Sequence, residues 1–190
     1  MELQASTDGL PVAFIVRAVL NKQSGPEALT FLKSVKHASG QNYILGIADS
    51  VYDFEASTNQ AVRFLPRKEY NSVVYHTNHA LVNHDVKEWY KDYHQKVMKC
   101  ETKTNNSEVR FASLEKHLNV QPSQISTALI KNTLRSKDSA TNPVCRDFNS
   151  GEFGFTFSSV LFTLGDKPSV QITNGSPNQS EYKEYFFKKL

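Results

Sequence analysis

The chain has 190 residues, of which 39% are hydrophobic and 22% are charged, and its formal net charge is +3. This length and balance are ordinary for a globular protein with a buried core. Lys and Arg are scattered and form no block, which argues against a nucleic-acid-binding or membrane-binding surface. Two cysteines, Cys100 and Cys145, cannot build a disulfide framework, so the composition favours reduced thiols and a cytoplasmic location.

The first 36 residues are expected to form a pair of amphipathic helices. Apolar residues between Val12 and Leu20 recur at the spacing of one helix face, and Pro11 suits the first turn of a helix. After Ser24-Gly25-Pro26, the same spacing returns between Ala28 and Val35. Both helices therefore present one apolar face.

The hydrophobic period then changes to two, which predicts short β-strands. Four strands are expected, with turn residues between the first three: 42–47, 51–56, 61–65 and 73–76. Such closely spaced strands predict an antiparallel meander with one apolar face.

The segment from Asp85 to Cys100 is polar and aromatic, and its pattern fits either a helix or a long loop. Asn105 and Glu108 have the spacing of a capping box, which predicts a helix that continues to Leu118. Another helix is expected to start at Pro122.

Residues 155–164 and 170–173 predict a last hairpin that turns at Gly165-Asp166. Helices, strands, helices and strands in this order indicate the α+β class with segregated layers. No repeat or linker divides the sequence, so residues 1–190 are expected to form a single domain.

The segment from Val73 to Asn83 carries the strongest functional signal. A β-type run leads into His76-Thr77-Asn78-His79, and the apolar pair Leu81-Val82 follows. An amide donor held between buried flanks suits an oxyanion site, which needs rigid donors aimed at developing charge. Polar residues that only bond to a turn at a strand end would give the same pattern.

Several short motifs occur along the chain in a fixed order: Gly9-Leu10-Pro11, His37 to Tyr43, Phe54-Glu55, His76 to His79, Val144-Cys145-Arg146, Thr156 to Leu164, Asn174 to Pro177 and Glu181-Tyr182. Together they resemble the acyl-coenzyme A:6-aminopenicillanic acid acyltransferase family. These are autoprocessing N-terminal-nucleophile hydrolases and acyltransferases, distantly similar to the choloylglycine hydrolases. The resemblance runs from about residue 9 to the C-terminus.

The resemblance implies an αββα four-layer N-terminal-nucleophile hydrolase sandwich, of which this chain is the C-terminal portion. It implies hydrolysis of, or acyl transfer to, a linear non-peptide amide through an acyl-enzyme. Asn78 would be the oxyanion donor, and Arg146 would orient the nucleophile or hold a carboxylate. The substrate pocket would be lined by Ser39, Gly40, Asn42, His76, Thr77 and His79.

The family's nucleophile is a Cys exposed by self-cleavage upstream of the Gly-Leu-Pro helix. Here no Cys precedes Cys100 and residue 2 is Glu. The expected partners are therefore a small-molecule amide or acyl substrate and either a second chain that carries the Cys or a second copy in a homo-oligomer. The alternative is a catalytically inactive relative that serves as a binding or oligomer-forming module.

Other roles for the same residues stay open. Cys145 could be a nucleophile beside Arg146, with His76 or His79 as its base. Arg146 could be an ordinary surface or ion-pair residue, and Glu55 could be a structural ion-pair partner of another residue. His76, His79 and His84 could be a metal cluster. Ligand spacing is poor for a metal and no glycine-rich phosphate loop is present, so neither a metal nor a cofactor is expected.

Overall fold

A computed structural model describes residues 2–47, 49–65, 73–100, 105–148 and 154–187. They form two compact units, one of Met1–Leu45 and Val51–Thr104 and the other of Gly46–Ser50 and Asn105–Leu190. Helices and strands are both present, as the α+β prediction requires. None of the helices in the described ranges has the length and apolar character needed to cross a bilayer. That residues 1–190 make a single domain stays a prediction.

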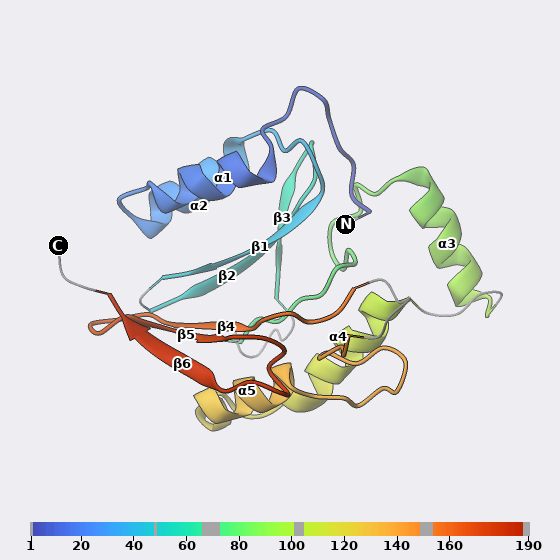
Figure 1. The fold of residues 1–190 in the computed structure, drawn as a ribbon. Helices are drawn as coiled ribbons and strands as arrows, with labels where there is room; N and C mark the ends of the chain where they lie inside the picture. The colour runs from blue at the N-terminus through green and yellow to red at the C-terminus, as the bar shows by residue number, and fades with distance from the viewer. Residues whose placement is uncertain (1, 48, 66–72, 101–104, 149–153, 188–190) are drawn as a thin grey trace. The chain divides into compact units, whose positions relative to one another are not determined.

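The first unit begins with the predicted helix pair. α1 spans Val12–Leu20 and α2 spans Gly25–Ser34. The hydroxyl of Ser24 accepts a hydrogen bond from the backbone N–H of Glu27, which caps α2 at its N-terminus. Figure 1 shows both helices along the sheet of this unit.

That sheet has three strands in the order β1-β2-β3, where β1 is Gln41–Gly46, β2 is Val51–Ala56 and β3 is Ala61–Phe64. β2 and β3 are antiparallel, with Asp53 opposite Phe64. Three of the four predicted strands are thus confirmed to within a residue.

The core of the first unit lies between the helices and this sheet. Its buried cluster contains Ile15, Leu32, Tyr43, Phe54 and Ala56. Because successive side chains of a strand point to opposite faces, Asp53 and Glu55 lie on the other face of β2 from Phe54. The strand that completes the core therefore also presents two carboxyl groups on its second face.

The predicted strand at 73–76 is wrong, because the segment Val73–Asn83 forms no strand. The backbone N–H groups of residues 81–83 bond to the Glu55 carboxylate and not to a neighbouring strand. After Asp85, the helical alternative is confirmed by α3, which spans Glu88–Met98.

The Gly-Leu-Pro and His-Ala-Ser-Gly motifs meet in space. Leu10 and His37 form a parallel β-bridge, with the N–H of Leu10 donating to the carbonyl of Lys36 at 2.7 Å. A Cβ added at Gly9 would lie 2.4 Å from the backbone nitrogen of Ala38. Gly9 is therefore required by this close approach of two backbones.

The second unit begins with α4, Asn106–Leu118, and its predicted capping box is confirmed. The N–H of Glu108 donates to Asn105 Oδ1, and the N–H of Asn105 donates to Glu108 Oε2, each at 2.9 Å. Two N–H groups at the helix start are satisfied in this way.

The helix expected at Pro122 is only a 3₁₀ turn, η1, which spans Pro122–Gln124. The longer helix α5 spans Thr127–Leu134, and its first turn is capped by the hydroxyl of Ser126. Ser126, which caps the helix that follows it, is therefore a better indicator of where this helix begins than Pro122.

The last hairpin is part of a three-stranded antiparallel sheet of β4 (Val160–Thr163), β5 (Ser169–Thr173) and β6 (Tyr182–Phe186). The sequence prediction missed β6, whose charged and aromatic residues do not alternate. The guanidinium of Arg135, the residue directly after α5, lies over the ring of Tyr182 at 5.4 Å from the ring centroid. Figure 1 shows α5 beside β6.

We predict that Gly9→Ala destabilises the first unit by more than about 2 kcal/mol, because the new Cβ meets backbone atoms that hold the Leu10–His37 bridge. Urea unfolding measures this change. Ser39→Ala is the control, since its hydroxyl only accepts from the side chain of Gln41, and it should change stability by under about 0.5 kcal/mol. Equal stabilities of the two variants would contradict the close-approach argument.

Candidate functional site

The site in the first unit is organised by the Glu55 carboxylate, which has no exposed surface. Its Oε1 accepts from the N–H of Leu81 at 2.6 Å, and its Oε2 accepts from the N–H groups of Val82 and Asn83 at 2.9 and 2.7 Å. A rigid strand thus holds the chain that follows Asn78.

His76 pairs with the same carboxylate from the other side. Its Nε2 lies 2.8 Å from Glu55 Oε1, and its Nδ1 bonds to the carbonyl oxygen of Thr77. Carboxylate and carbonyl oxygens only accept, so both ring nitrogens must carry a proton and His76 is an imidazolium. The predicted ion-pair role of Glu55 is confirmed.

The pKa shifts of the pair follow from this geometry. Burial alone lowers the pKa of His76, but the hydrogen bonds to Glu55 and to the Thr77 carbonyl outweigh it, and the net pKa is raised. Burial alone raises the pKa of Glu55, but the bonds from His76 and from residues 81–83 outweigh it, and the net pKa is lowered. Both shifts therefore favour the charged forms of the pair, the imidazolium of His76 and the carboxylate of Glu55.

Asn83 is a buried structural residue. Its Nδ2 donates to the carbonyl oxygens of Glu55 and Gln60 at 3.0 and 3.3 Å. Its Oδ1 accepts from the Gln60 side chain at 2.8 Å and from the N–H of Asp85 at 3.0 Å. Asn83 therefore ties the end of the segment to the β2–β3 turn.

Asn78 is the exposed residue of the His-Thr-Asn-His sequence. His76 before it bonds to Glu55, and His79 after it is buried, with its Nδ1 3.1 Å from the Thr77 hydroxyl. Asn78 thus lies between two histidines whose side chains are hydrogen-bonded. This is an arrangement that can present a side-chain amide in a defined place.

Asn42 reaches the second carboxyl group of β2. Its Nδ2 donates to Asp53 Oδ1 and, at 3.4 Å, to the carbonyl oxygen of Phe54. Asp53 has no exposed surface, and its Oδ2 has no hydrogen-bond partner among the described residues. Burial raises the pKa of Asp53 to about 6, against the lowering effects of Asn42 and of the His76 charge.

The structure brings Asn42 and His76 together around these two carboxyl groups, whereas Ser39 and Gly40 have other neighbours. The Ser39 hydroxyl accepts from Gln41 Nε2 at 3.1 Å. Gly40 is buried, and a Cβ added there would lie 2.5 Å from Leu3 Cβ. The contact of Gly40 with Leu3 is a packing contact.

Cys145 and Arg146 belong to the second unit. The Cys145 thiol is fully buried, donates to Asn178 Oδ1 at 3.2 Å and lies 3.3 Å from the Ser176 hydroxyl. The backbone of Arg146 pairs with Thr156, whose hydroxyl accepts from the Arg146 N–H at 3.0 Å. This burial suits a structural thiol better than a nucleophile.

A second cation lies near Arg146. The pKa of Arg110 is lowered, first by burial and then by the positive charge of Arg146. The Nε of Arg110 donates to Asn106 Oδ1 at 2.7 Å. Two neighbouring guanidinium groups favour an anionic group between or beside them.

The three histidines do not meet as a metal site. His76 and His79 bond as described above, and His84 is exposed. In the part of the chain that the structure describes, no group of three or more His, Cys, Asp or Glu side chains gathers in a way that could hold a metal ion.

Sequence reasoning missed Asp53 and Arg110 as members of these clusters. A signal existed for Asp53, because a carboxyl group two residues from Glu55 in a strand must share its face. No local pattern indicated Arg110, which lies 36 residues from Arg146 in the sequence.

The fold is a mixture of helices and sheets, and the Phe54-Glu55 and His76 to His79 motifs of its first unit meet at the buried Glu55 carboxylate. The model of the family described as acyl-coenzyme A:6-aminopenicillanic acid acyl-transferase matches residues 1–179. Because the match covers nearly the whole chain, the protein belongs to this family, and the resemblance seen in the motifs is confirmed. No curated protein matches the chain.

Asp53 predicts an unusual pH dependence of stability. The pKa of Asp53 is about 6 in the folded protein and about 3.8 ordinarily. The stabilising contribution of protonated Asp53 to the free energy of unfolding is therefore complete below about pH 4 and is lost as the pH rises to 6. Asp53→Asn imitates the protonated acid. We expect equal stability at pH 4 and a variant that is more stable by on the order of 3 kcal/mol at pH 7.

Chemical denaturation of both proteins from pH 4 to pH 7.5 measures this difference. Glu55 and His76 are present in both proteins, so the difference reports the charge of Asp53, including its coupling to these two neighbours. Parallel stability curves would show that Asp53 does not titrate in this range.

Proposed function

We propose that this protein takes part in the hydrolysis of, or acyl transfer to, a linear non-peptide amide C–N bond through an acyl-enzyme. Asn78 supplies the side-chain amide that stabilises the tetrahedral intermediate. One observation carries the proposal: the exposed Asn78 lies in a segment held by a buried, fully hydrogen-bonded Glu55.

This observation matters because an oxyanion donor acts through its fixed position. A donor that must reorganise when charge develops loses most of its advantage. Here the His76 ring before Asn78 and the N–H groups of residues 81–83 after it bond to a single carboxylate on β2. Membership of an acyltransferase family supports the same chemistry.

The nucleophile of this proposal is a Cys on another segment or on a second chain. Cys145 is buried and bonded to Asn178, and the exposed Cys100 follows directly after α3 and Lys99. The expected architecture of the assembled enzyme is the αββα four-layer sandwich, with this chain as its C-terminal portion. Ser39, Gly40, Asn42, Thr77 and His79 would line or support its pocket.

Arg146 would hold a carboxylate in the assembled site or orient the nucleophile. The neighbouring Arg110 supports the first of these roles, since its charge adds to the positive potential around Arg146. The buried His76 would position the segment that carries Asn78 by bonding to Glu55.

The second candidate function is an inactive relative that binds a ligand or builds an oligomer. The burial of Cys145 agrees with it, although both candidates leave this thiol out of catalysis. Activity after addition of a nucleophile-bearing segment separates the two candidates, because an inactive relative stays inactive.

We predict that the isolated chain does not cleave acyl amides or p-nitrophenyl esters, and that it gains amidase activity when co-expressed with the nucleophile-bearing segment of a family enzyme. In that complex Asn78→Ala should lower kcat by roughly two to three orders of magnitude, the usual loss for one oxyanion donor. The melting temperature should change little, since Asn78 is exposed.

Asn83→Ala is the matched control, because it removes a buried amide that bonds to Glu55 and Gln60. It should lower the melting temperature by several degrees. An Asn78→Ala variant that unfolds the protein but keeps its specific activity would make Asn78 a structural cap. Turnover by the isolated chain that Cys145→Ala abolishes would instead make Cys145 the nucleophile.

The sheet of the second unit bears an exposed apolar face. Val160 pairs with Ile172, and Phe162 pairs with Val170, which in turn pairs with Tyr185. Cross-strand partners share a face, and Phe162 and Tyr185 are 59% and 53% exposed. We propose that the nucleophile-bearing chain or a second copy covers this face, since exposed apolar patches of this kind mark association sites.

Sedimentation velocity at micromolar concentration should therefore show a dimer or a larger species. Phe162→Glu should shift the protein toward the monomer, because a carboxylate would be buried in the interface. Thr163→Glu adds the same charge on the opposite face of β4 and should leave the association unchanged. A wild-type monomer with one cooperative melting transition would refute the covering of this face by a second copy.

A further inference from the structure

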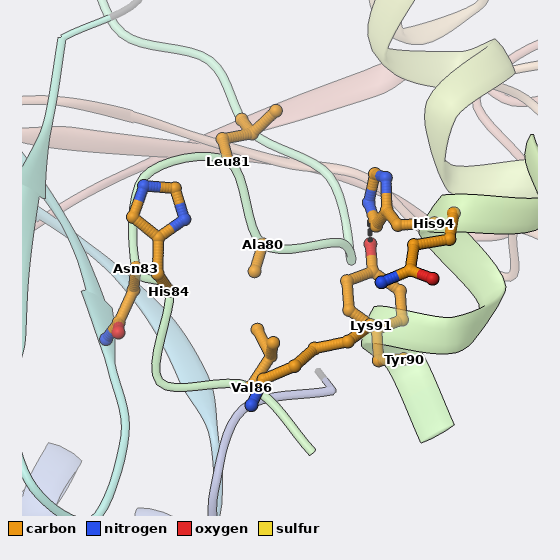
Figure 2. A pocket seen from close by; sticks show the side chains of 9 residues that line it. Ala80, Leu81, Asn83, His84, Val86, Tyr90, Lys91 and His94 are labelled. Atoms are coloured by element: carbon orange, nitrogen blue, oxygen red, sulfur yellow. Dashed lines mark hydrogen bonds between the residues drawn. The ribbon is translucent and has the colours of Figure 1, made fainter. Parts of the chain in front are cut away.

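The first unit contains a pocket of about 470 Å³ between residues 80–86 and α3 (Figure 2). This volume lies in the range of small-molecule sites. Its lining consists of Ala80, Leu81, Asn83, His84, Val86, Tyr90, Lys91, His94 and Gln95. The pocket is built from one unit and does not include Asn78.

The lining is apolar inside and basic at its rim. The ring of Tyr90 is buried, and Leu81 and Val86 are half-buried, so these side chains provide an apolar floor. Lys91 and His94 are exposed. Of the described residues that line the pocket, none is acidic.

The polar groups of Tyr90 and His94 bond to each other inside the pocket, whereas Lys91 forms an exposed ion pair at the rim. The Tyr90 hydroxyl and His94 Nε2 share a hydrogen bond of 3.1 Å. Lys91 Nζ donates to Glu88 at 2.9 Å, but the Glu88 side chain is 80% exposed, and such surface pairs contribute little. In Figure 2 the Lys91 side chain extends from α3 toward Val86. An anion in the pocket would compete with Glu88 for this ammonium group.

We propose that this pocket binds a small apolar carboxylate, such as a short-chain or aryl-substituted carboxylic acid. The hydrocarbon part packs against Leu81, Val86 and Tyr90, and the carboxylate accepts hydrogen bonds from Lys91. A neutral amide would accept a weaker hydrogen bond from the ammonium group, and a cation would be repelled by it.

Binding has a structural consequence for the segment that follows Asn78. The wall residue Leu81 also donates its backbone N–H to Glu55. A ligand packed on Leu81 and α3 adds contacts that exist only in the folded segment, so it should raise the melting temperature in a concentration-dependent way. This inference is independent of the proposed catalytic role, because it requires no nucleophile.

Titration of the ¹⁵N-labelled full chain with hexanoate tests the proposal. Amide signals of residues 80–86 and of α3 should shift, with hexanoate binding about tenfold more tightly than hexanamide, the value of one charge-assisted hydrogen bond. Hexylamine should produce no shifts there. Equal affinities for hexanoate and hexanamide, or hexanoate shifts confined to other residues, would overturn it.

Three charge variants sharpen the test. Lys91→Gln should weaken hexanoate binding about tenfold, whereas Glu88→Gln should strengthen it about twofold by removing the competing carboxylate. Lys96→Gln, in the last turn of the same helix, is the matched control and should bind as the wild type does. An unchanged affinity in Lys91→Gln would refute the role of the ammonium group.

Ala80→Leu provides a steric test, since its side chain would fill part of the cavity. It should weaken hexanoate and hexanamide alike, and undiminished binding would place the ligand elsewhere.

Discussion

The Glu55 carboxylate joins β2 to the segment that carries the His-Thr-Asn-His sequence. Four donors converge on its two oxygens: one from the His76 ring and three from the backbone of residues 81–83. A buried charge is tolerated only when its hydrogen bonds and its charge are satisfied, and loss of one partner of such a pair typically costs about 3–5 kcal/mol. The position of Asn78 depends on this interaction.

Two carboxyl groups on one face of β2 behave in opposite ways. Glu55 has four donors and a lowered pKa, while Asp53 has the Asn42 amide as its recorded donor and a raised pKa of about 6. The two are two residues apart and equally buried. The number of donors that tertiary contacts bring to each carboxyl group, and not the residue type or the burial, decides which pKa is lowered and which is raised.

Much of the secondary structure could be predicted because its signals are local. The apolar spacing between Val12 and Leu20, the change to a period of two after residue 41, and the Asn105–Glu108 capping box each involve neighbours within one or two turns or strands. The ordered motifs also predicted the family correctly. The strand predicted at 73–76 is absent although its residues have a period-two pattern. Further along the segment, the N–H groups of residues 81–83 bond to the Glu55 side chain in place of a neighbouring strand.

The sequence by itself determined the helix pair, the three-stranded meander, the capped start of α4 and the family. These features follow from periodicities, caps and motifs that adjacent residues carry. Only the tertiary structure decided that Glu55 bonds to residues 26 to 28 positions away and that His76 is an imidazolium. It also decided that Asp53 Oδ2 has no hydrogen-bond partner among the described residues. The physical reason is that the charge of a buried group depends on donors from distant segments, which no local pattern records.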